Sequence, residues 1–187
     1  MQLPSLPVLG AVWGVSECCL AFWRRSESDA RSRDRHSLWL ILFVDAVSIG
    51  AGILVASRVP AFGFPLWKVL NLVGLCLFAS GLLLRWYSIV YLGRFFTTNV
   101  AIAADHRLID TGPYRVIRHP SYLGAMLAFL GFSLGFANWA SFVIIIVPIF
   151  SALLWRIQIE EAALTEALGE RYRSYVRRTK RLIPSVY

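Results

Sequence analysis

The sequence predicts an all-α integral membrane protein, a bundle of about five transmembrane helices with a cytoplasmic helical extension at its C-terminal end. Of the 187 residues, 57% are hydrophobic and 14% aromatic, above the apolar share of roughly 45 to 50% found in soluble domains. The apolar residues also gather into five segments, and about 20 such residues are needed for a helix to cross a bilayer. We therefore expect residues 1–187 to form one membrane domain.

The five apolar segments are interpreted as the membrane spans. They are Leu6 to Trp23, Leu38 to Ala56, Val69 to Val90, Ser121 to Phe136, and Trp139 to Trp155. Arg85 lies inside the third segment, so we expect this span to end near Leu84. The helix should then continue into the membrane interface, where Trp86 and Tyr87 suit the depth of the lipid headgroups.

The last two segments carry signals of their own. The fourth is short, and its Gly124, Gly131 and Gly135 indicate close approach to a neighbouring helix rather than contact with lipid. The fifth should emerge from the membrane and continue to about Leu168, where Gly169 would supply a left-handed C-cap. Polar residues follow, so this last part forms the predicted cytoplasmic extension.

Basic residues concentrate in alternate loops, which predicts the orientation of the bundle by the positive-inside rule. The loop after the first span, the loop after the third and the C-terminal tail hold most of them: Arg24, Arg25, Arg31, Arg33, Arg35, Arg94, Arg107, Arg115, Arg118, Arg171, Arg173, Arg177, Arg178, Lys180 and Arg181. The N-terminus should lie outside and the C-terminus in the cytoplasm. The net charge of +8 then favours anionic membrane lipids, not nucleic acid, as partners.

Polar residues within the spans raise the question of internal pairing. Glu17, Asp45 and Asn71 interrupt apolar segments, and such residues mostly face the interior of a bundle. We expect them to pair there; the alternative is that one of them lines a lateral route for a lipid. The three cysteines lie in apolar segments without the spacing of metal ligands, and the sequence predicts no metal site.

The chain divides into two parts of different character. Residues 1–91 form a three-helix N-terminal part, and residues 92–187 hold the charged motifs. The second part opens with a connection from Leu92 to His119, and a loop this long in a compact bundle is unusual unless it covers a site. It closes with a short basic amphipathic helix, Glu170 to Lys180, that carries Tyr172 and Tyr175.

The first charged motif stands at the start of the fourth apolar segment. Pro120 suits the first position of a helix, because its missing N–H group would be unpaired there in any case. Free backbone amides near Ser121 and Tyr122, together with Arg118 and His119, would form a corner that attracts an anion. The alternative is an ordinary helix cap with interfacial arginines.

The second motif is a pair of acids after the fifth apolar segment. Arg156 and Glu160 are four residues apart and share a helix face, whereas Glu161 is rotated by about 100° from its neighbour. One acid would pair with the arginine while the other faces a pocket; a surface salt bridge with a solvated acid is the alternative. A ligand with a positive charge, hydroxyls and an amino-acid carboxylate would satisfy both motifs if they meet at the inner leaflet.

A longer pattern runs through the second part of the chain. It consists of Leu92-Gly93-Arg94, Gly112-Pro113-Tyr114, Arg118-His119-Pro120, Tyr122-Leu123-Gly124, Glu160-Glu161, Leu164, Gly169, Tyr172, Tyr175 and Arg181-Leu182-Ile183-Pro184. In these residues the chain resembles the isoprenylcysteine carboxyl methyltransferase family, and phospholipid methyltransferases share the broader pattern. The resemblance covers roughly the C-terminal half.

The resemblance implies that residues 92–187 form a cofactor-binding catalytic half that takes S-adenosylmethionine as methyl donor on the cytoplasmic side. The residues implied for this cofactor are Ile117, His119, Pro120, Tyr122, Leu123, Gly124, Glu160 and Glu161. An aromatic ring and a carboxylate would favour the sulfonium, and the helix start would hold the methionyl carboxylate. Arg118 or Arg156 is the candidate for orienting an acceptor carboxylate, with a structural ion pair as the alternative.

The predicted acceptor is a small apolar or lipid-linked carboxylate, as in isoprenylcysteine-type O-methylation of a prenylated substrate. A carboxylate is already anionic near neutral pH, so alignment is the main requirement. Three alternatives stay open. Phospholipid-type amine methylation would need His119, Glu160 or Glu161 as a base, an NADPH-dependent membrane reductase would bind a dinucleotide, and a transporter or assembly subunit would carry its functional charges at mid-membrane.

Overall fold

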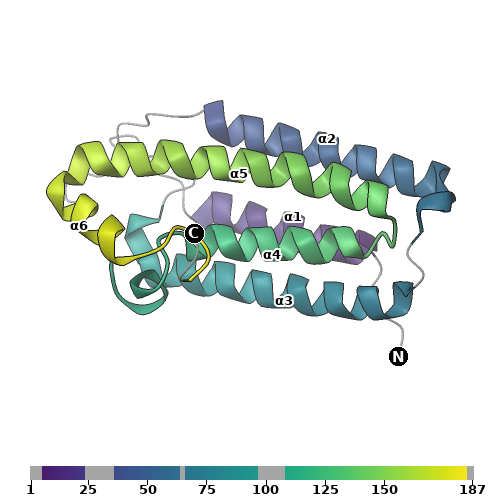
Figure 1. Cartoon of the computed structure of the whole chain (residues 1–187), viewed down its shortest axis with the longest axis horizontal. Helices are drawn as coiled ribbons and strands as arrows, with labels where there is room; N and C mark the ends of the chain where they lie inside the picture. Colours follow the sequence, from purple (N-terminus) through teal and green to yellow (C-terminus); the bar gives the residue numbers. More distant parts are fainter. Residues whose placement is uncertain (1–5, 24–35, 64–65, 97–107, 185–187) are drawn as a thin grey trace.

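The computed structural model describes residues 6–23, 36–63, 66–96 and 108–184. Its α-helices are α1 (Leu6–Trp23), α2 (His36–Arg58), α3 (Trp67–Leu92), α4 (Pro120–Leu134), α5 (Trp139–Leu168) and α6 (Glu170–Arg178), with short 3-10 turns η1 (Pro60–Phe62), η2 (Gly93–Phe95) and η3 (Gly112–Arg115). Helices α1 to α5 run side by side, and α6 folds back at one end (Figure 1). The all-α prediction is confirmed.

All five predicted spans are helical, but they differ in length. Within the described residues, α2, α3 and α5 are long and apolar enough to cross a membrane by length and composition, whereas α1 and α4 are shorter apolar helices. The 15 residues of α4 extend about 22 Å at about 1.5 Å per residue, less than the roughly 30 Å of a hydrocarbon core. By this criterion, three of the five predicted spans are of full length within the described residues.

Helix α4 lies between α3 and α5 (Figure 1), and glycines bring its backbone against α3. A Cβ atom at Gly124 would lie 2.6 Å from the backbone nitrogen of Arg85, and one at Gly131 would lie 2.5 Å from that of Phe78. Only glycine allows this approach, as predicted for the fourth segment. Gly135 makes a similar approach to a side chain of α1.

An ion pair inside the bundle joins α1 to α3. The helix continues through Arg85 as predicted, but the arginine turns inward and its side chain is 13% exposed. Its Nε and Nη2 atoms donate to the two carboxylate oxygens of Glu17 at 2.8 and 2.9 Å, so the expected pairing of Glu17 is confirmed. Asp45 differs from this expectation, since its buried Oδ1 atom has no hydrogen-bond partner within the described residues.

Residues suited to helix capping stand at both ends of α5. The Asn138 side chain accepts a hydrogen bond from the Ser141 backbone and donates one to the Val59 carbonyl oxygen at 3.0 Å, which ties α5 to the end of α2. At the other end Gly169 has φ 55° and ψ −129°. The positive φ was predicted, but this ψ lies outside the left-handed helical region.

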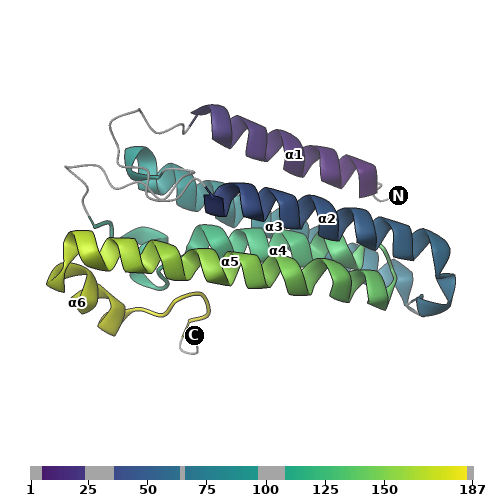
Figure 2. The ribbon, with the colours of Figure 1, turned by 90° about the horizontal axis from the view of Figure 1, so that it is seen from above.

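The segments that flank the basic loops meet at one end of the bundle. The end of α1, the start of α2, the end of α3, the start of α4 and the whole of α6 lie there in both views (Figures 1 and 2). The opposite end holds η1 and the turn between α4 and α5. The charged motifs of the second half of the chain therefore converge at one end.

Candidate active site

The C-terminal segment, residues 179–184, passes beside the start of α4 (Figure 1). The backbone nitrogens of Arg118 and His119 donate to the carbonyl oxygens of Lys180 and Arg181 at 2.8 and 3.1 Å. Leu182 follows and enters the apolar core at 4% exposure. The residues that precede α4 are thus held by the far end of the chain, about 60 positions away.

Glu161 on α5 is the centre of the ionic contacts here. Its carboxylate accepts hydrogen bonds from Arg118 Nε at 2.8 Å and from Arg181 Nη2 at 2.6 Å, and His119 Nε2 lies 3.1 Å away. Arg118 also donates to the Thr179 carbonyl oxygen at 2.5 Å. With 12% of its side chain exposed, Glu161 binds the start of α4 and the C-terminal segment to α5. The arginines on this acid come from other segments, whereas Arg156, which the sequence places on one face with Glu160, is joined to that acid through Tyr122.

Arg156 belongs to a second network that joins α2, α4 and α5. The residue is 4% exposed, and its guanidinium donates to Tyr122 Oη at 3.1 Å and to Ser37 Oγ. Tyr122 Oη in turn donates to Glu160 Oε2 at 2.9 Å. A buried charge is costly unless it is hydrogen-bonded, so these contacts account for the position of Arg156. They also place Glu160 in a network separate from that of Glu161.

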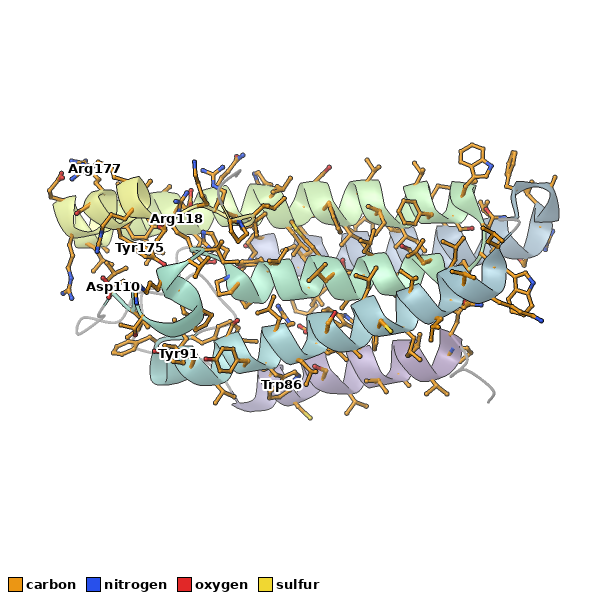
Figure 3. All side chains as sticks on the ribbon, turned by 60° about the horizontal axis from the view of Figure 1, so that its bottom comes forward. Trp86, Tyr91, Asp110, Arg118, Tyr175 and Arg177 are labelled. Atoms are coloured by element: carbon orange, nitrogen blue, oxygen red, sulfur yellow. The ribbon has the colours of Figure 1, made fainter. Side chains whose placement is uncertain are left out.

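A cavity of about 70 Å³ opens beside these two networks. The residues lining it are Leu92, Phe95, Leu108, Ile109, Tyr114, Arg118, His119, Glu160, Leu164, Tyr172 and Tyr175. Apolar and tyrosine side chains line it together with an acid, a histidine and an arginine. Figure 3 shows Arg118, Tyr175 and Asp110 gathered at this end of the bundle.

Tyrosines hold the segment before α4 against the rest of the site. Tyr114 of η3 donates to the Ser88 carbonyl oxygen at 3.2 Å, and Tyr175 of α6 donates to the Tyr114 carbonyl oxygen at 2.6 Å. Tyr91 donates to Thr111 Oγ1 at 2.9 Å (Figure 3). Because α3, η3 and α6 are joined by these bonds, the cavity has a defined shape on this side.

Tyr172 differs from the tyrosines around it. Its residue exposure is 2%, and its buried hydroxyl oxygen has no hydrogen-bond partner within the described residues. Burial, together with the negative charges of Glu161 and Glu160, raises the pKa of the Tyr172 phenol. The hydroxyl therefore keeps its proton near neutral pH.

The structure brings most of the predicted site residues together. Arg118, His119 and Glu160 line the cavity. Tyr122, Glu161 and Arg156 lie behind them and are joined to them by the hydrogen bonds described above. The two charged motifs, which are about 40 residues apart in the chain, therefore meet at one end of the bundle as predicted.

Besides Tyr122 and Glu161, four predicted cofactor residues do not belong to the described cavity lining. Ile117 forms a bridge with Lys180 of the C-terminal segment, and Pro120 begins α4 as predicted. Leu123 packs against the apolar core, and Gly124 faces α3. The structure thus shows these residues positioning the start of α4, and contact with a cofactor stays a prediction for them.

Several residues that the structure places at the site were not predicted from the sequence. Tyr114, Tyr172 and Tyr175 line the cavity, Arg181 binds Glu161, and Ser37 accepts from Arg156. The tyrosines and Arg181 were part of the family pattern, and this membership was the available signal. Ser37 lies more than a hundred residues from Arg156, so local sequence offers no sign of its contact.

Comparison with known proteins shows which family this chain is similar to. The profile of the family described as phospholipid methyltransferase matches residues 69–171. Protein-S-isoprenylcysteine O-methyltransferase B of Arabidopsis thaliana is 31% identical over 122 residues, which are 64% of this chain and 61% of that protein. Protein-S-isoprenylcysteine O-methyltransferase of Schizosaccharomyces pombe is 33% identical over 132 residues, which are 67% of this chain and 52% of that protein.

A solved structure shares the fold over nearly the whole chain. The eukaryotic intramembrane Ras methyltransferase ICMT (isoprenylcysteine carboxyl methyltransferase) superimposes with a TM-score of 0.68 at 24% identity, covering 95% of this chain and 64% of that one. The fold is therefore that of an all-α intramembrane bundle. The family profile matches more than half of the sequence, so the chain belongs to the phospholipid methyltransferase family. The matched part spans 61% and 52% of the two curated relatives, and the predicted resemblance is confirmed.

Proposed function

We propose that this chain is a membrane methyltransferase that uses S-adenosylmethionine to methylate a small apolar or lipid-linked carboxylate, as in isoprenylcysteine-type O-methylation. The observation that carries the proposal is the cavity at the end of the bundle, whose lining combines His119 and Glu160 with apolar side chains. The names of the curated relatives, which are isoprenylcysteine O-methyltransferases, support the choice of a carboxylate acceptor.

The residues around the cavity fit such a methyl donor. Its flat base suits the apolar wall, where Leu92, Phe95 and Leu164 stand, and its cationic groups suit the carboxylate of Glu160. The buried hydroxyl of Tyr172 has no hydrogen-bond partner within the described residues, and unpaired buried groups of this kind call for an explanation in native structures. When bound, S-adenosylmethionine supplies a methyl group activated by the positive charge on its sulfur.

We assign different roles to the two neighbouring acids. Glu161 already accepts from Arg118 and Arg181 and lies beside His119, so its oxygens are occupied by the protein. Glu160 accepts from Tyr122 and lines the cavity. Glu160 therefore contacts the cofactor, and Glu161 is a positioning residue that acts through Arg118 and His119.

Arg156 is the residue that we assign to the acceptor carboxylate. It lies one helical turn closer to the membrane than Glu160 on α5, and Tyr122 joins the two residues. A planar guanidinium suits two parallel hydrogen bonds to a carboxylate. Arg118, the other candidate, is engaged with Glu161 and the Thr179 carbonyl oxygen, and we assign it to holding the C-terminal segment.

Alignment is the contribution that the protein would make to the reaction. The acceptor carboxylate is already ionised, so no side chain has to remove a proton before a carboxylate oxygen attacks the methyl carbon. Holding two reactants in line contributes up to about 7 to 11 kcal/mol in favourable cases. Arg156 and Glu160, both on the rigid helix α5, would fix the two reactants relative to each other.

We place the site at the cytoplasmic face of the membrane, with the N-terminus outside. The basic helix α6, whose last turn contains Arg177 and Arg178, and the segment before α4 lie at the same end of the bundle. Basic residues next to membrane spans favour the cytoplasmic side. A lipid-linked acceptor would then reach Arg156 from the inner leaflet, between the helices.

A transfer assay tests the proposal and its second candidate, amine methylation, which the description of the matched family favours. The purified chain is incubated in lipid nanodiscs with methyl-labelled S-adenosylmethionine and either a prenylated cysteine with a blocked amino group or phosphatidylethanolamine. We expect label in the prenylated cysteine as a base-labile methyl ester. Label in phosphatidylethanolamine would establish amine methylation instead. No transfer, with binding of reduced nicotinamide dinucleotide, would favour a reductase.

A further inference from the structure

The outward face of α6 and the residues just after it form a strongly basic surface. Tyr172 and Tyr175 turn inward at 2% and 3% exposure, so the basic side chains of this helix are left on the outside. The exposed cations of this basic surface are Arg171, Arg173, Arg177, Arg178 and Lys180. Glu170 is the one acid between positions 170 and 180, and the surface therefore carries a net positive charge.

The acids near this surface do not neutralise it. Glu170 lies 2.6 Å from Arg177 and 3.8 Å from Arg173, and all three side chains are more than 60% exposed. Solvent screens exposed pairs of this kind, so they contribute little and exchange readily for another anion. Within the described residues, Arg171 and Lys180 pair with no acid. The basic surface thus has cations available for an external anion.

Aliphatic side chains are exposed next to these cations. Val176 on α6, Ile183 after it and Val116 before α4 are 36%, 50% and 53% exposed. The segment that contains Val116 lies beside the C-terminal segment, because Ile117 forms a bridge with Lys180. Surfaces that lie in the interface of a bilayer combine these two features, since the aliphatic groups reach the acyl boundary while the cations stay among the headgroups.

Contacts with α3 place the C-terminal segment near the depth of the headgroups. Arg85 Nη1 donates to the carbonyl oxygen of Ser121 at 3.4 Å, so the start of α4 is level with the point where α3 is expected to leave the hydrocarbon. The backbone nitrogen of His119 donates to the Arg181 carbonyl oxygen at 3.1 Å, which holds the C-terminal segment at that level. In both views this segment returns along the side of the bundle after α6 (Figures 1 and 2).

We propose that the basic surface, with the exposed aliphatic groups beside it, binds the headgroups of anionic phospholipids. A headgroup with a net negative charge matches the exposed cations, whereas a zwitterionic headgroup supplies no net charge. The C-terminal segment also carries Arg181, which binds Glu161 at 2.6 Å, so bound lipid would hold this segment against α5. The proposal concerns binding alone and does not depend on methyl transfer.

Native mass spectrometry of the full chain in detergent tests the proposal. The protein is titrated with phosphatidylglycerol or with phosphatidylcholine of the same acyl chains, and the bound lipids are counted. The double variant Arg171→Gln/Lys180→Gln removes the two cations without an acid partner. The matched control is Arg58→Gln/Lys68→Gln, which removes two exposed cations at the opposite end of the bundle and changes the net charge equally.

We expect the parent to bind phosphatidylglycerol more tightly than phosphatidylcholine. Each basic residue at an anionic surface contributes about fivefold in affinity, so Arg171→Gln/Lys180→Gln should bind phosphatidylglycerol about 25-fold more weakly. Its affinity for phosphatidylcholine should stay the same. The control variant should keep the phosphatidylglycerol affinity of the parent within about twofold.

Three results would overturn the proposal. Equal affinity of the parent for the two lipids would show that the surface does not select an anionic headgroup. Equal weakening in the two double variants would assign the preference to the net charge of the whole chain. Binding of a poly-glutamate peptide by the parent, without any preference among lipids, would make the surface a docking site for an acidic protein.

Thermal unfolding without added lipid shows whether the variants are intact. Both double variants should unfold at the temperature of the parent, because exposed side chains without an acid partner add little to stability. A lower unfolding temperature for Arg171→Gln/Lys180→Gln alone would show that these cations have partners in the protein. That result would also count against a surface that is free for lipid.

Discussion

Arg181 donates two hydrogen bonds to Oε2 of Glu161, one from Nη2 at 2.6 Å and one from Nε at 3.0 Å. The two residues belong to different elements, since Glu161 lies on α5 and Arg181 on the C-terminal segment. Because Arg118 binds the other carboxylate oxygen, one acid holds three segments of the site together. The shape of the cavity therefore depends on a residue that does not line it.

Replacing Glu161 by Gln should destabilise the protein as a whole. The substitution removes the negative charge that Arg118 and Arg181 bind. The Glu161 side chain is 12% exposed, and removing one partner of a buried ion pair costs about 3 to 5 kcal/mol. Thermal unfolding in detergent should show a drop of several degrees. Glu170→Gln, which alters an exposed pair on α6, is the control and should leave the unfolding temperature unchanged; equal shifts for the two variants would contradict this account.

Replacing Glu160 by Gln should weaken cofactor binding and spare the fold. The amide oxygen still accepts from Tyr122, but the negative charge that favours a cation is lost. We expect the Kd for S-adenosylmethionine to rise at least about tenfold, which corresponds to about 1.4 kcal/mol. Calorimetry measures this change, and Glu166→Gln, an exposed residue of the same helix outside the described cavity lining, should bind normally. An unchanged Kd in Glu160→Gln would remove this acid from the site.

Replacing Arg156 by Lys should affect the acceptor rather than the cofactor. Lysine keeps the charge but lacks the planar fork that binds a carboxylate with two hydrogen bonds. In the transfer assay, KM for the prenylated cysteine should rise by roughly tenfold or more, while the Kd for S-adenosylhomocysteine stays the same. Ser37→Ala, which removes one contact of Arg156, should have a smaller effect. A parallel loss of cofactor affinity would assign Arg156 to the cofactor instead.

Replacing Gly124 by Ala should separate α3 from α4. The added Cβ atom would lie 2.6 Å from the backbone nitrogen of Arg85, and overpacking of this kind costs about 1 to 3 kcal/mol. We expect a lower unfolding temperature and a weaker affinity for S-adenosylhomocysteine, because α4 carries Tyr122 into the site. Gly14→Ala, where a Cβ atom meets nothing within 4 Å, should be neutral or stabilising. Equal stability of the two variants would show that α3 and α4 are not in close contact.

The helices could be predicted from the sequence because the signals that mark them are local. Apolar length marked all five helices of the bundle, and the start of α4 at Pro120 followed from the chemistry of proline. The close approach of α4 to α3 was visible in Gly124 and Gly131. These features depend on a residue and its near neighbours, so they can be predicted without coordinates.

The pairings inside the site depended on contacts that local patterns do not encode. Glu160 and Glu161 are adjacent and chemically equal, and their separate roles arise from Tyr122 on one side and Arg181 on the other. The inward turn of Arg85 likewise follows from Glu17, which lies 68 residues earlier. Helix periodicity states which residues share a face, but not which distant segment will cover that face.

A structure of the chain determined with S-adenosylhomocysteine would test the central claim most directly. We expect the ligand to occupy the cavity lined by His119 and Glu160, with its base against the apolar lining residues Leu92, Phe95 and Leu164. A ligand bound elsewhere on the bundle, or a cavity that stays empty at saturating ligand, would contradict it.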